Sequence, residues 1–366
     1  MSSGNKTICI IGGGVAGLLA AVTAADEGAS VKLFEKMSKV GLKTKVERGG
    51  RVFPASDDAQ EVRHLFMDLL RKKKVELHLD ESVTRILTKD GEVSGIVTDK
   101  GSYGAGAVIL CTGGSSYPRT GSTGDGYRMA RELGHKVTAI RPALIPLVCK
   151  ESYGKELQGL SLKNVSFSID AGGRRKASEF GEMLFTHFGV SGPIVLMLSD
   201  KASLWLSQGH EIKASIDLKP ALTEDVLDKR VLRDLETYHL KQMAGALQDL
   251  MPHRMIDVIL SLAGIERDLT VSDLKKAQRI ALVKTMKAMP LTVTGTRPIS
   301  EAIVTAGGVS VKEINPSTME SKVVKKLYMA GEVLDVHAFT GGYNLQAAFS
   351  TGHLAALSAV RSLENA

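Results

Sequence analysis

Cysteine is scarce in this sequence of 366 residues. Only Cys9, Cys111 and Cys149 occur, widely spaced and set within apolar segments. An odd number at such spacing predicts neither a disulfide framework nor a metal site. We therefore expect the three side chains to be buried as small hydrophobic groups, and we expect no bound metal.

Long apolar runs are also missing. None approaches the ~20 residues that a helix needs to span a bilayer. The stretch Ile8 to Ile11 is too short for a signal-peptide core and leads directly into glycines, so no targeting segment is expected. These observations predict a cytoplasmic protein without membrane association.

Charge does not single out one partner. Hydrophobic residues make up 43% and charged residues 24%, as in ordinary soluble globular proteins, and the length predicts two or three domains. The net charge of +7 is spread over segments of mixed sign. The basic run from Lys36 to Arg51 has no interleaved aromatic residues on which bases would stack. We therefore expect a small-molecule partner and no nucleic acid, and the oligomeric state stays open.

The first 35 residues contain a nucleotide-binding pattern. An apolar strand through Ile11 meets Gly12-Gly13-Gly14-Val15-Ala16-Gly17, an Ala/Leu-rich helix follows to about Glu27, and a second strand ends at Glu35. Gly12 permits a tight turn, Gly14 allows close approach of a pyrophosphate, and Gly17 lets helix and strand pack closely. The helix N-terminus favours phosphate, and the carboxylate of Glu35 is placed to accept hydrogen bonds from a ribose diol.

The next segment favours FAD over NAD. An amphipathic helix is predicted from Asp57 to Lys73, then a strand with Val75, Leu77 and Leu79, and then a hairpin turning at Asp90-Gly91. A buried strand from Ala107 to Cys111 ends in Thr112-Gly113-Gly114. A small antiparallel meander followed by such a strand is typical of FAD-binding oxidoreductases, whereas NAD dehydrogenases continue with further βα units.

The C-terminal part of the sequence contains further motifs that fit an FAD site. A short strand, Leu327 to Ala330, runs into Gly331-Glu332, with Asp335 just beyond. Gly341-Gly342-Tyr343-Asn344 then opens a helix that is predicted to reach about Val360. Its N-terminus, aimed at the pyrimidine edge of a flavin, would stabilise the negative charge that the ring gains with a hydride. The simpler alternative is an ordinary packing helix.

Several long motifs resemble one family. They are IIGGGVAGLLAA, GRVFPASDDAQEV, CTGGSSYPRTGSTGDGYRMARELGH, FTHFGVSGP, EAIVTAGGVSVKEINPSTMESK and LYMAGEVLDVHAFTGGYNLQAAFSTG, in this order along nearly the whole chain. The sequence is identified as similar to the BaiN-like NAD(P)/FAD-dependent oxidoreductases, which include aminoacetone oxidase. One departure stands out, because the Gly-Arg-Cys-Asn segment usual after the acid of the second strand is absent from this sequence.

The resemblance implies an α/β fold of the two-dinucleotide-binding-domain flavoprotein type. A Rossmann-like FAD domain would comprise 1–140 and 325–366, an inserted β-rich domain 141–221 and 288–324, and a helical subdomain 222–287. Within the last, helices are predicted over Thr223–Leu250, His253–Leu262 and Thr270–Lys287, the third opening with a capping box of Thr270 and Asp273. The predicted FAD-binding residues are Gly12, Gly14, Val15, Ala16, Gly17, Glu35, Lys36, Val83, Thr112, Gly113, Gly114, Gly331, Glu332, Asp335, Gly341, Gly342, Tyr343, Asn344 and Leu345.

The implied chemistry is hydride transfer between flavin N5 and a small amine, alcohol, enone or carbonyl compound, with oxygen or NAD(P)H as the other partner. Tyr343 and His187 are the candidate catalytic residues, and His337 is a third, although each histidine fits a structural role equally well. No second complete GxGxxG unit is present, which favours the oxidase version. The alternative is a catalytically weak or silent flavin- or nucleotide-binding protein, because a cofactor-site segment is missing.

Overall fold

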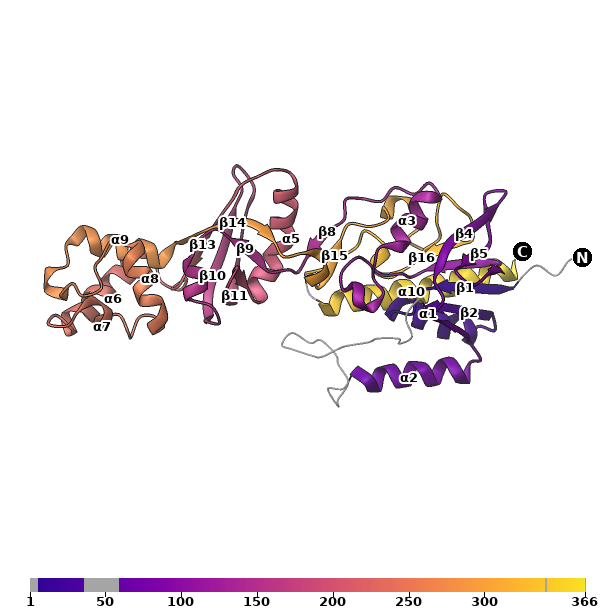
Figure 1. The fold of residues 1–366 in the computed structure, drawn as a ribbon, viewed down its shortest axis with the longest axis horizontal. Helices are drawn as coiled ribbons and strands as arrows, with labels where there is room; N and C mark the ends of the chain where they lie inside the picture. The colour runs from indigo at the N-terminus through magenta and orange to yellow at the C-terminus, as the bar shows by residue number, and fades with distance from the viewer. Residues whose placement is uncertain (1–5, 36–58, 340, 366) are drawn as a thin grey trace, which may run out of the picture. The chain divides into compact units, whose positions relative to one another are not determined.

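The computed structural model describes residues 6–35, 59–339 and 341–365. The chain, drawn in Figure 1, forms two compact units, Met1–Pro142 with Ile299–Ala366 and Ala143–Pro298. Each unit has its own apolar core. Residues 299–324, which the resemblance assigned to the inserted domain, thus group with the first unit. The three-part division with a separate helical subdomain stays a prediction.

A five-stranded parallel sheet in the order β16-β7-β1-β2-β3 forms the centre of the first unit. β1 pairs with β2 on one side and β7 on the other, so its apolar residues Ile8 to Ile10 are fully buried, as is usual for a central parallel strand. The carboxyl ends of all five strands meet at one edge, where open α/β sheets bind ligands. The strands are β1 (Thr7–Ile11), β2 (Ser30–Glu35), β3 (Glu76–Leu79), β7 (Ala107–Leu110) and β16 (Leu327–Met329).

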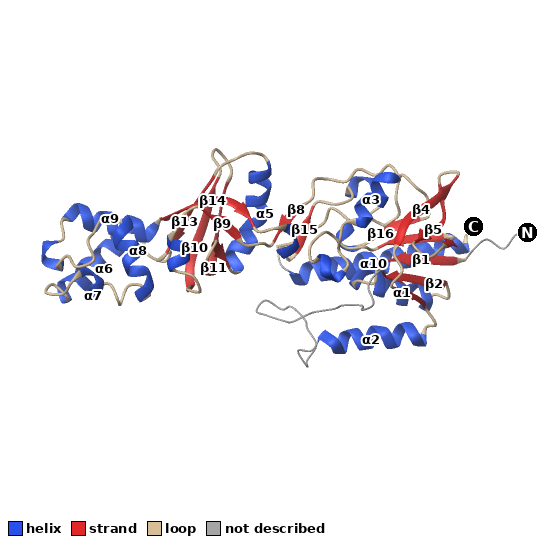
Figure 2. Ribbon diagram, viewed as in Figure 1, coloured by secondary structure: helices blue, strands red, loops and turns tan. Residues whose placement is uncertain are grey.

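Two helices of this unit, α1 and α10, lie side by side against the sheet (Figure 2). Their backbones approach so closely at Gly352 that a Cβ there would overlap the carbonyl oxygen of Ala16. The helices of the unit are α1 (Val15–Asp26), α2 (Ala59–Lys72), α3 (Asp125–Glu132) and α10 (Gly341–Glu364), with 3₁₀ turns η1 (Pro118–Thr120), η3 (Ile299–Glu301), η4 (Val311–Glu313) and η5 (Gly331–Val333).

An antiparallel three-stranded sheet packs through β5 against β7. Its first hairpin turns at Asp90 and Gly91, both with positive φ, which confirms the Asp-Gly hairpin predicted from the sequence. A separate pair, β8 with β15, forms a two-stranded sheet. The bounds are β4 (Val83–Lys89), β5 (Glu92–Thr98), β6 (Ser102–Gly104), β8 (Arg141–Ala143) and β15 (Val304–Ala306).

A closed barrel in the order β10-β11-β12-β9-β14-β13 forms the second unit's β-structure. Its strands alternate, so that in β10 Phe167 and Ile169 are buried while Ser168 and Asp170 face outward. The β-rich character of the insertion is therefore confirmed. The strands are β9 (Leu147–Cys149), β10 (Ser161–Asp170), β11 (Lys176–Thr186), β12 (Gly189–Ser191), β13 (Ile212–Asp217) and β14 (Met289–Thr296).

The helices of the second unit include one that we did not predict. α5 begins at Pro193, directly after Gly192, whose φ of 96° suits glycine. The helices are α4 (Tyr153–Glu156), α5 (Pro193–Ser207), α6 (Glu224–Thr237), α7 (Met243–Ala246), α8 (His253–Leu262) and α9 (Lys276–Lys287), with the 3₁₀ turn η2 (Val271–Asp273).

Two predicted helices of this region are wrong in extent. The helix Thr223–Leu250 is interrupted after Thr237, and the helix Thr270–Lys287 begins only at Lys276. Gln242 and Thr270 lie within the two predicted helices but have extended backbones and form a β-bridge with each other. The predicted capping box of Thr270 and Asp273 is likewise wrong, because Gln278 Oε1 accepts from the N–H of Lys275 at the true start.

Three further observations concern the sequence-based exclusions. Cys9 and Cys111 are buried, whereas Cys149 is only partly buried, which differs from our expectation. Over the described ranges, no helix is long and apolar enough to cross a membrane. Nor does that part of the chain gather three metal-binding side chains at one point.

Candidate functional site

The glycine-rich turn after β1 tolerates no side chains at two positions. Gly12 has a φ of 103°, and a Cβ there would lie 2.5 Å from the carbonyl oxygen of Cys111. A Cβ on Gly17 would overlap the carbonyl oxygen of Gly12. Helix α1 therefore packs directly on the turn, as the GxGxxG spacing predicts.

The N-terminus of α1 is open toward the strand ends. Gly14 is its N-cap in extended conformation, and no side chain caps the helix. The first helical bond runs from the N–H of Leu18 to the carbonyl of Gly14, so the N–H groups of Val15, Ala16 and Gly17 have no acceptor within the helix. A Cβ on Gly14 would meet no atom within 4 Å. Uncapped donors beside open space fit a diphosphate.

Glu35 stands beside this turn at the end of β2. Its Oε2 accepts a hydrogen bond of 2.6 Å from the backbone N–H of Gly13. The residue is only 9% exposed, so the carboxylate is held at the edge of the turn rather than in free solvent. This is the position that a ribose-binding acid requires relative to the phosphate-binding helix.

The C-terminal part of the chain contributes a second side of the candidate site, next to the start of α1. Gly331 follows β16 with a φ of 76°, and a Cβ on it would lie 3.0 Å from the Cβ of Ala16. Its N–H donates to Thr351 Oγ1 of α10 over 3.0 Å. The end of β16, the start of α1 and the first half of α10 therefore meet at one place.

Glu332 and Thr305 form a polar cluster on this side of the site. Glu332 Oε1 accepts from the N–H of Thr305 at 2.5 Å, while Thr305 Oγ1 accepts from the N–H groups of Ser115 and Ser116 at 2.8 and 3.1 Å. Burial raises the pKa of the Glu332 carboxyl, although hydrogen bonds from Thr305 and Ser116 act in the opposite direction. A Cβ on Gly114 would overlap Thr305 Oγ1, so this glycine permits the contact.

A pocket of about 20 Å³ opens between η5 and α10. Glu332, Asn344, Ala348 and Thr351 contribute to its lining. The volume holds about one water molecule. The pocket therefore brings together predicted residues from the segments 331–335 and 341–345.

The loop before α10 is held by Asn344. Its Oδ1 accepts from the N–H of Ala338 and its Nδ2 donates to the carbonyl of the same residue, both at 2.9 Å. This paired contact fixes the backbone that leads into the helix N-terminus. Asp335 lies three residues before Ala338, and its backbone N–H donates a hydrogen bond to the carbonyl of Val309.

Comparison with known proteins now adds to this geometry. The model of the HI0933-like protein Rossmann domain matches residues 37–358, and an FAD-binding domain model matches residues 7–64. The chain belongs to the HI0933-like family. It is therefore an FAD-dependent oxidoreductase, and FAD is its cofactor. When bound, FAD supplies a ring that accepts and donates a hydride.

Three curated relatives match most of this chain. A 3-dehydro-bile acid delta(4,6)-reductase of Clostridium scindens is 34% identical over 89% of this chain and 79% of its own length. A ribosomal RNA dihydrouridine synthase of Haemophilus influenzae is 28% identical over 96% of this chain and 98% of its own length. The ribosomal RNA dihydrouridine synthase of Escherichia coli is 31% identical over 86% and 75%, respectively.

The remaining predicted FAD-binding residues vary in their setting. Gly342, Tyr343, Asn344 and Leu345 lie in the first turns of α10, which begins at Gly341. Gly113 has a φ of 70°, and Thr112 Oγ1 is buried without a hydrogen-bond partner among the described residues. Val83 is 8% exposed within the apolar core, and Lys36 lies outside the described residues. Their contacts with FAD stay predictions.

The candidate catalytic residues fall in different units. Tyr343 is 65% exposed at the start of α10, and His337 lies in the preceding loop. His187 lies at the exposed tip between β11 and β12, where its ring meets Phe188 edge-on at 4.9 Å between centroids. Nothing in this geometry assigns a reaction step to any of them.

Sequence reasoning missed the polar residues that support the site. Thr305 lies about 190 residues after Ser115 and Ser116, and the only local signal was the short run Val304-Thr305-Ala306 before two glycines.

A chain of three contacting side chains, two of them buried, was missed as well. Ser321 Oγ contacts His135 Nε2 at 2.8 Å, and His135 Nδ1 contacts Glu313 Oε2 at 3.1 Å. Ser321 is 6% exposed and its Oγ accepts from two backbone N–H groups, so this triad-like order is structural.

Proposed function

We propose that this protein reduces a carbon–carbon double bond conjugated to a carbonyl group, with NAD(P)H as the electron source. The support comes from the names of two relatives whose substrates look unrelated. One is a reductase of double bonds at positions 4 and 6 of a 3-oxo compound. The other makes dihydrouridine, which differs from uridine by two hydrogens across a ring double bond conjugated to a carbonyl. Both products need a hydride and a proton.

The single observation that carries the proposal is the placement of the N-terminus of α10. This helix runs for 24 residues, and contacts at Gly352 and Thr351 hold it to the start of α1 and the end of β16. The dipole of a helix of this length favours negative charge near its N-terminus. Bound FAD would supply the hydride for the β-carbon of the substrate, and the N-terminus of α10 would favour the negative charge that hydride chemistry places on the cofactor.

A proton must reach the α-carbon when the hydride reaches the β-carbon. Tyr343 carries an exposed phenol in the first turn of α10, and we propose it as the proton donor. The proposal departs from the oxidase version that the missing second GxGxxG unit favoured, because the relatives' names describe reductions. The catalytically silent flavoprotein is the remaining alternative.

Two half-reactions test the proposal. Purified holoprotein is first mixed anaerobically with NADH or NADPH, and bleaching of the flavin absorbance is followed. A 4-ene-3-oxosteroid or uridine in an RNA oligomer is then added, and reoxidation of the flavin is followed together with a mass gain of two hydrogens in the product. Bleaching by a nicotinamide and reoxidation by a conjugated substrate support the proposal. Failure of all acceptors to reoxidise a flavin that oxygen does reoxidise would overturn it.

A further inference from the structure

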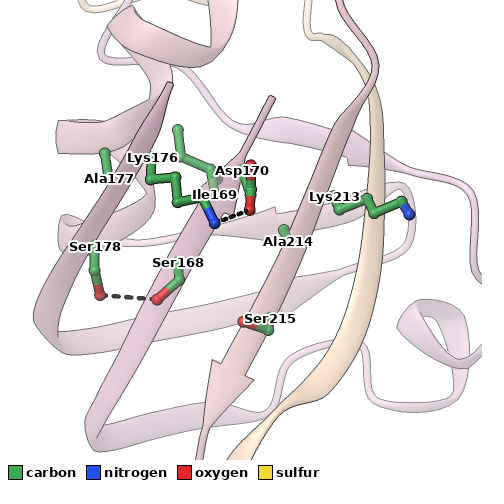
Figure 3. A pocket seen from close by; sticks show the side chains of 9 residues that line it. All are labelled: Ser168, Ile169, Asp170, Lys176, Ala177, Ser178, Lys213, Ala214 and Ser215. Atoms are coloured by element: carbon green, nitrogen blue, oxygen red, sulfur yellow. Dashed lines mark hydrogen bonds and ion pairs between the residues drawn. The ribbon is translucent and has the colours of Figure 1, made fainter. Parts of the chain in front are cut away.

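The outer face of three barrel strands carries an ordered set of polar side chains. The register places Ser168 of β10 opposite Ser178 of β11 and Ser215 of β13, so that three serines form one row across the strands. The hydroxyls of Ser168 and Ser178 are hydrogen-bonded at 2.8 Å. Figure 3 shows this row and the side chains around it.

A charged row lies next to the serine row. Asp170 stands opposite Lys176 on one side and Lys213 on the other, and Lys176 Nζ lies 3.0 Å from its carboxylate (Figure 3). Lys213 is exposed and has no ion pair within the described part of the chain. Arg174 and Arg175 follow in the adjoining turn and are also exposed. The exposed Glu211 lies two residues before Lys213, so four cations and two carboxylates leave this end of the face with a positive charge.

An aromatic ring borders the serine row on its other side. Phe180 of β11 stands opposite Ser166, and its alternation with Ser178 places it on the same outer face. The residue is 63% exposed, which is uncommon for a side chain of this size on a polar strand. Beyond it, the exposed Glu182 limits the positive surface at that end.

The short serine side chains leave a hollow between the longer ones. The pocket over this face has a volume of about 560 Å³ and is lined by both the serine and the lysine rows. Its floor therefore offers hydroxyl groups and one edge offers cations, while the exposed ring of Phe180 lies outside the lining, two residues along β11 from Ser178. A flexible chain with phosphates on one side and flat bases on the other matches these three features.

We propose that this face of the barrel binds a segment of single-stranded nucleic acid. Lys213 and Lys176 contact phosphates, the serine hydroxyls contact phosphate or sugar oxygens, and a base stacks on Phe180. This surface differs from the basic run of residues 36–51, where the sequence made nucleic-acid binding only a weak alternative. It goes beyond the proposed reductase function, because it needs neither FAD nor a conjugated acceptor.

Fluorescence anisotropy with a labelled decauridine RNA tests the proposal on the full-length holoprotein. We expect Lys213→Ala to weaken binding and to reduce the slope of log K against log salt by about 0.7. Phe180→Ala is expected to weaken binding about tenfold without changing that slope, and Phe180→Tyr to restore it. The matched controls are Lys201→Ala, an exposed lysine on α5, and Leu240→Ala, an apolar residue that is 81% exposed.

Competition experiments distinguish binding through base stacking from binding through phosphate charge alone. Deoxythymidine decamer competes with the RNA if the surface recognises single strands in general, whereas inorganic polyphosphate competes only weakly. The proposal is overturned if decauridine does not bind at low salt, if the two variants behave as their controls do, or if polyphosphate competes as well as RNA. Flavin bleaching by NAD(P)H in the same variants stays unchanged, so loss of RNA binding is distinguished from loss of the reductase function.

Discussion

The backbone N–H of Gly13 donates to Oε2 of Glu35 over 2.6 Å, joining the glycine-rich turn to the acid at the end of the second strand. This bond couples the shape of the phosphate-binding turn to the position of the carboxylate. An amide at position 35 can still accept the hydrogen bond from Gly13 but carries no charge for a ribose hydroxyl.

The Glu35→Gln variant is therefore expected to keep its fold and to bind FAD about tenfold more weakly, since a charge-assisted hydrogen bond becomes a neutral one. Titration of the flavin-free protein with FAD, followed by fluorescence quenching, measures the change. Glu27→Gln, at an exposed position after α1, serves as the control. Equal FAD affinities for the two variants would show that the charge of Glu35 does not contribute to FAD binding.

Gly17 and Gly14 are expected to respond differently to alanine. A Cβ on Gly17 overlaps the carbonyl of Gly12, so Gly17→Ala should destabilise the protein by about 1–3 kcal/mol or more. A Cβ on Gly14 enters open space, so Gly14→Ala should keep its stability but lose FAD affinity. Urea unfolding and FAD titration together separate the effects. Strong destabilisation by Gly14→Ala would contradict the open site.

Thr305 supports the loop of Gly114 and Ser116 through its hydroxyl. In Thr305→Val the buried N–H of Ser116 and the partly buried N–H of Ser115 lose their acceptor, which should cost about 2 kcal/mol of unfolding free energy. Thr305→Ser keeps the oxygen and should recover most of this. The control is Thr84→Val, at an exposed position of β4. If valine at both positions gives the same unfolding midpoint, the hydroxyl has no supporting role.

His135 is expected to make stability depend on pH. Burial lowers the pKa of its imidazole below the ordinary value of 6.5, although Glu313 acts in the opposite direction. The folded state therefore favours neutral His135, so this contribution is fully present above pH 6.5 and is lost as the pH falls through the lower folded pKa. The slope should approach about 1.4 kcal/mol per pH unit within that window.

Urea midpoints between pH 8 and pH 5 measure this effect in the wild type, in His135→Gln and in the exposed control His239→Gln. His135→Gln should be less stable at pH 8 but should lose less stability on acidification. A pH profile identical to that of the wild type would assign the dependence to other groups.

Tyr343→Phe tests the proposed proton donor. We expect flavin bleaching by NAD(P)H to be unchanged and reoxidation by the conjugated substrate to slow about 100-fold, which is a typical contribution of a general acid. Tyr103→Phe removes a phenol hydroxyl from the three-stranded sheet of the same unit and should leave both half-reactions intact. Equal slowing of both half-reactions in Tyr343→Phe would point to a packing role instead.

The first strand, the glycine turn, α1 and Glu35 were predictable because neighbouring residues determine them. Gly12 needs positive φ, Gly17 needs close packing, and the apolar run needs a buried sheet. The helix α8 and the Asp90-Gly91 hairpin were predictable for the same reason. The supporting cluster was not, since Thr305 meets Ser115 and Ser116 across about 190 residues of sequence.

Local turns, residue spacings and long motifs were enough to identify the dinucleotide-binding unit, its preference for FAD and the family. The end of α6 and the start of α9 could not be predicted from local propensity, because the chain between them includes a β-bridge of Gln242 to Thr270 that forms only on folding. Only the tertiary structure decided that Ser168, Ser178 and Ser215 share one row, because strand register arises from pairing between distant segments.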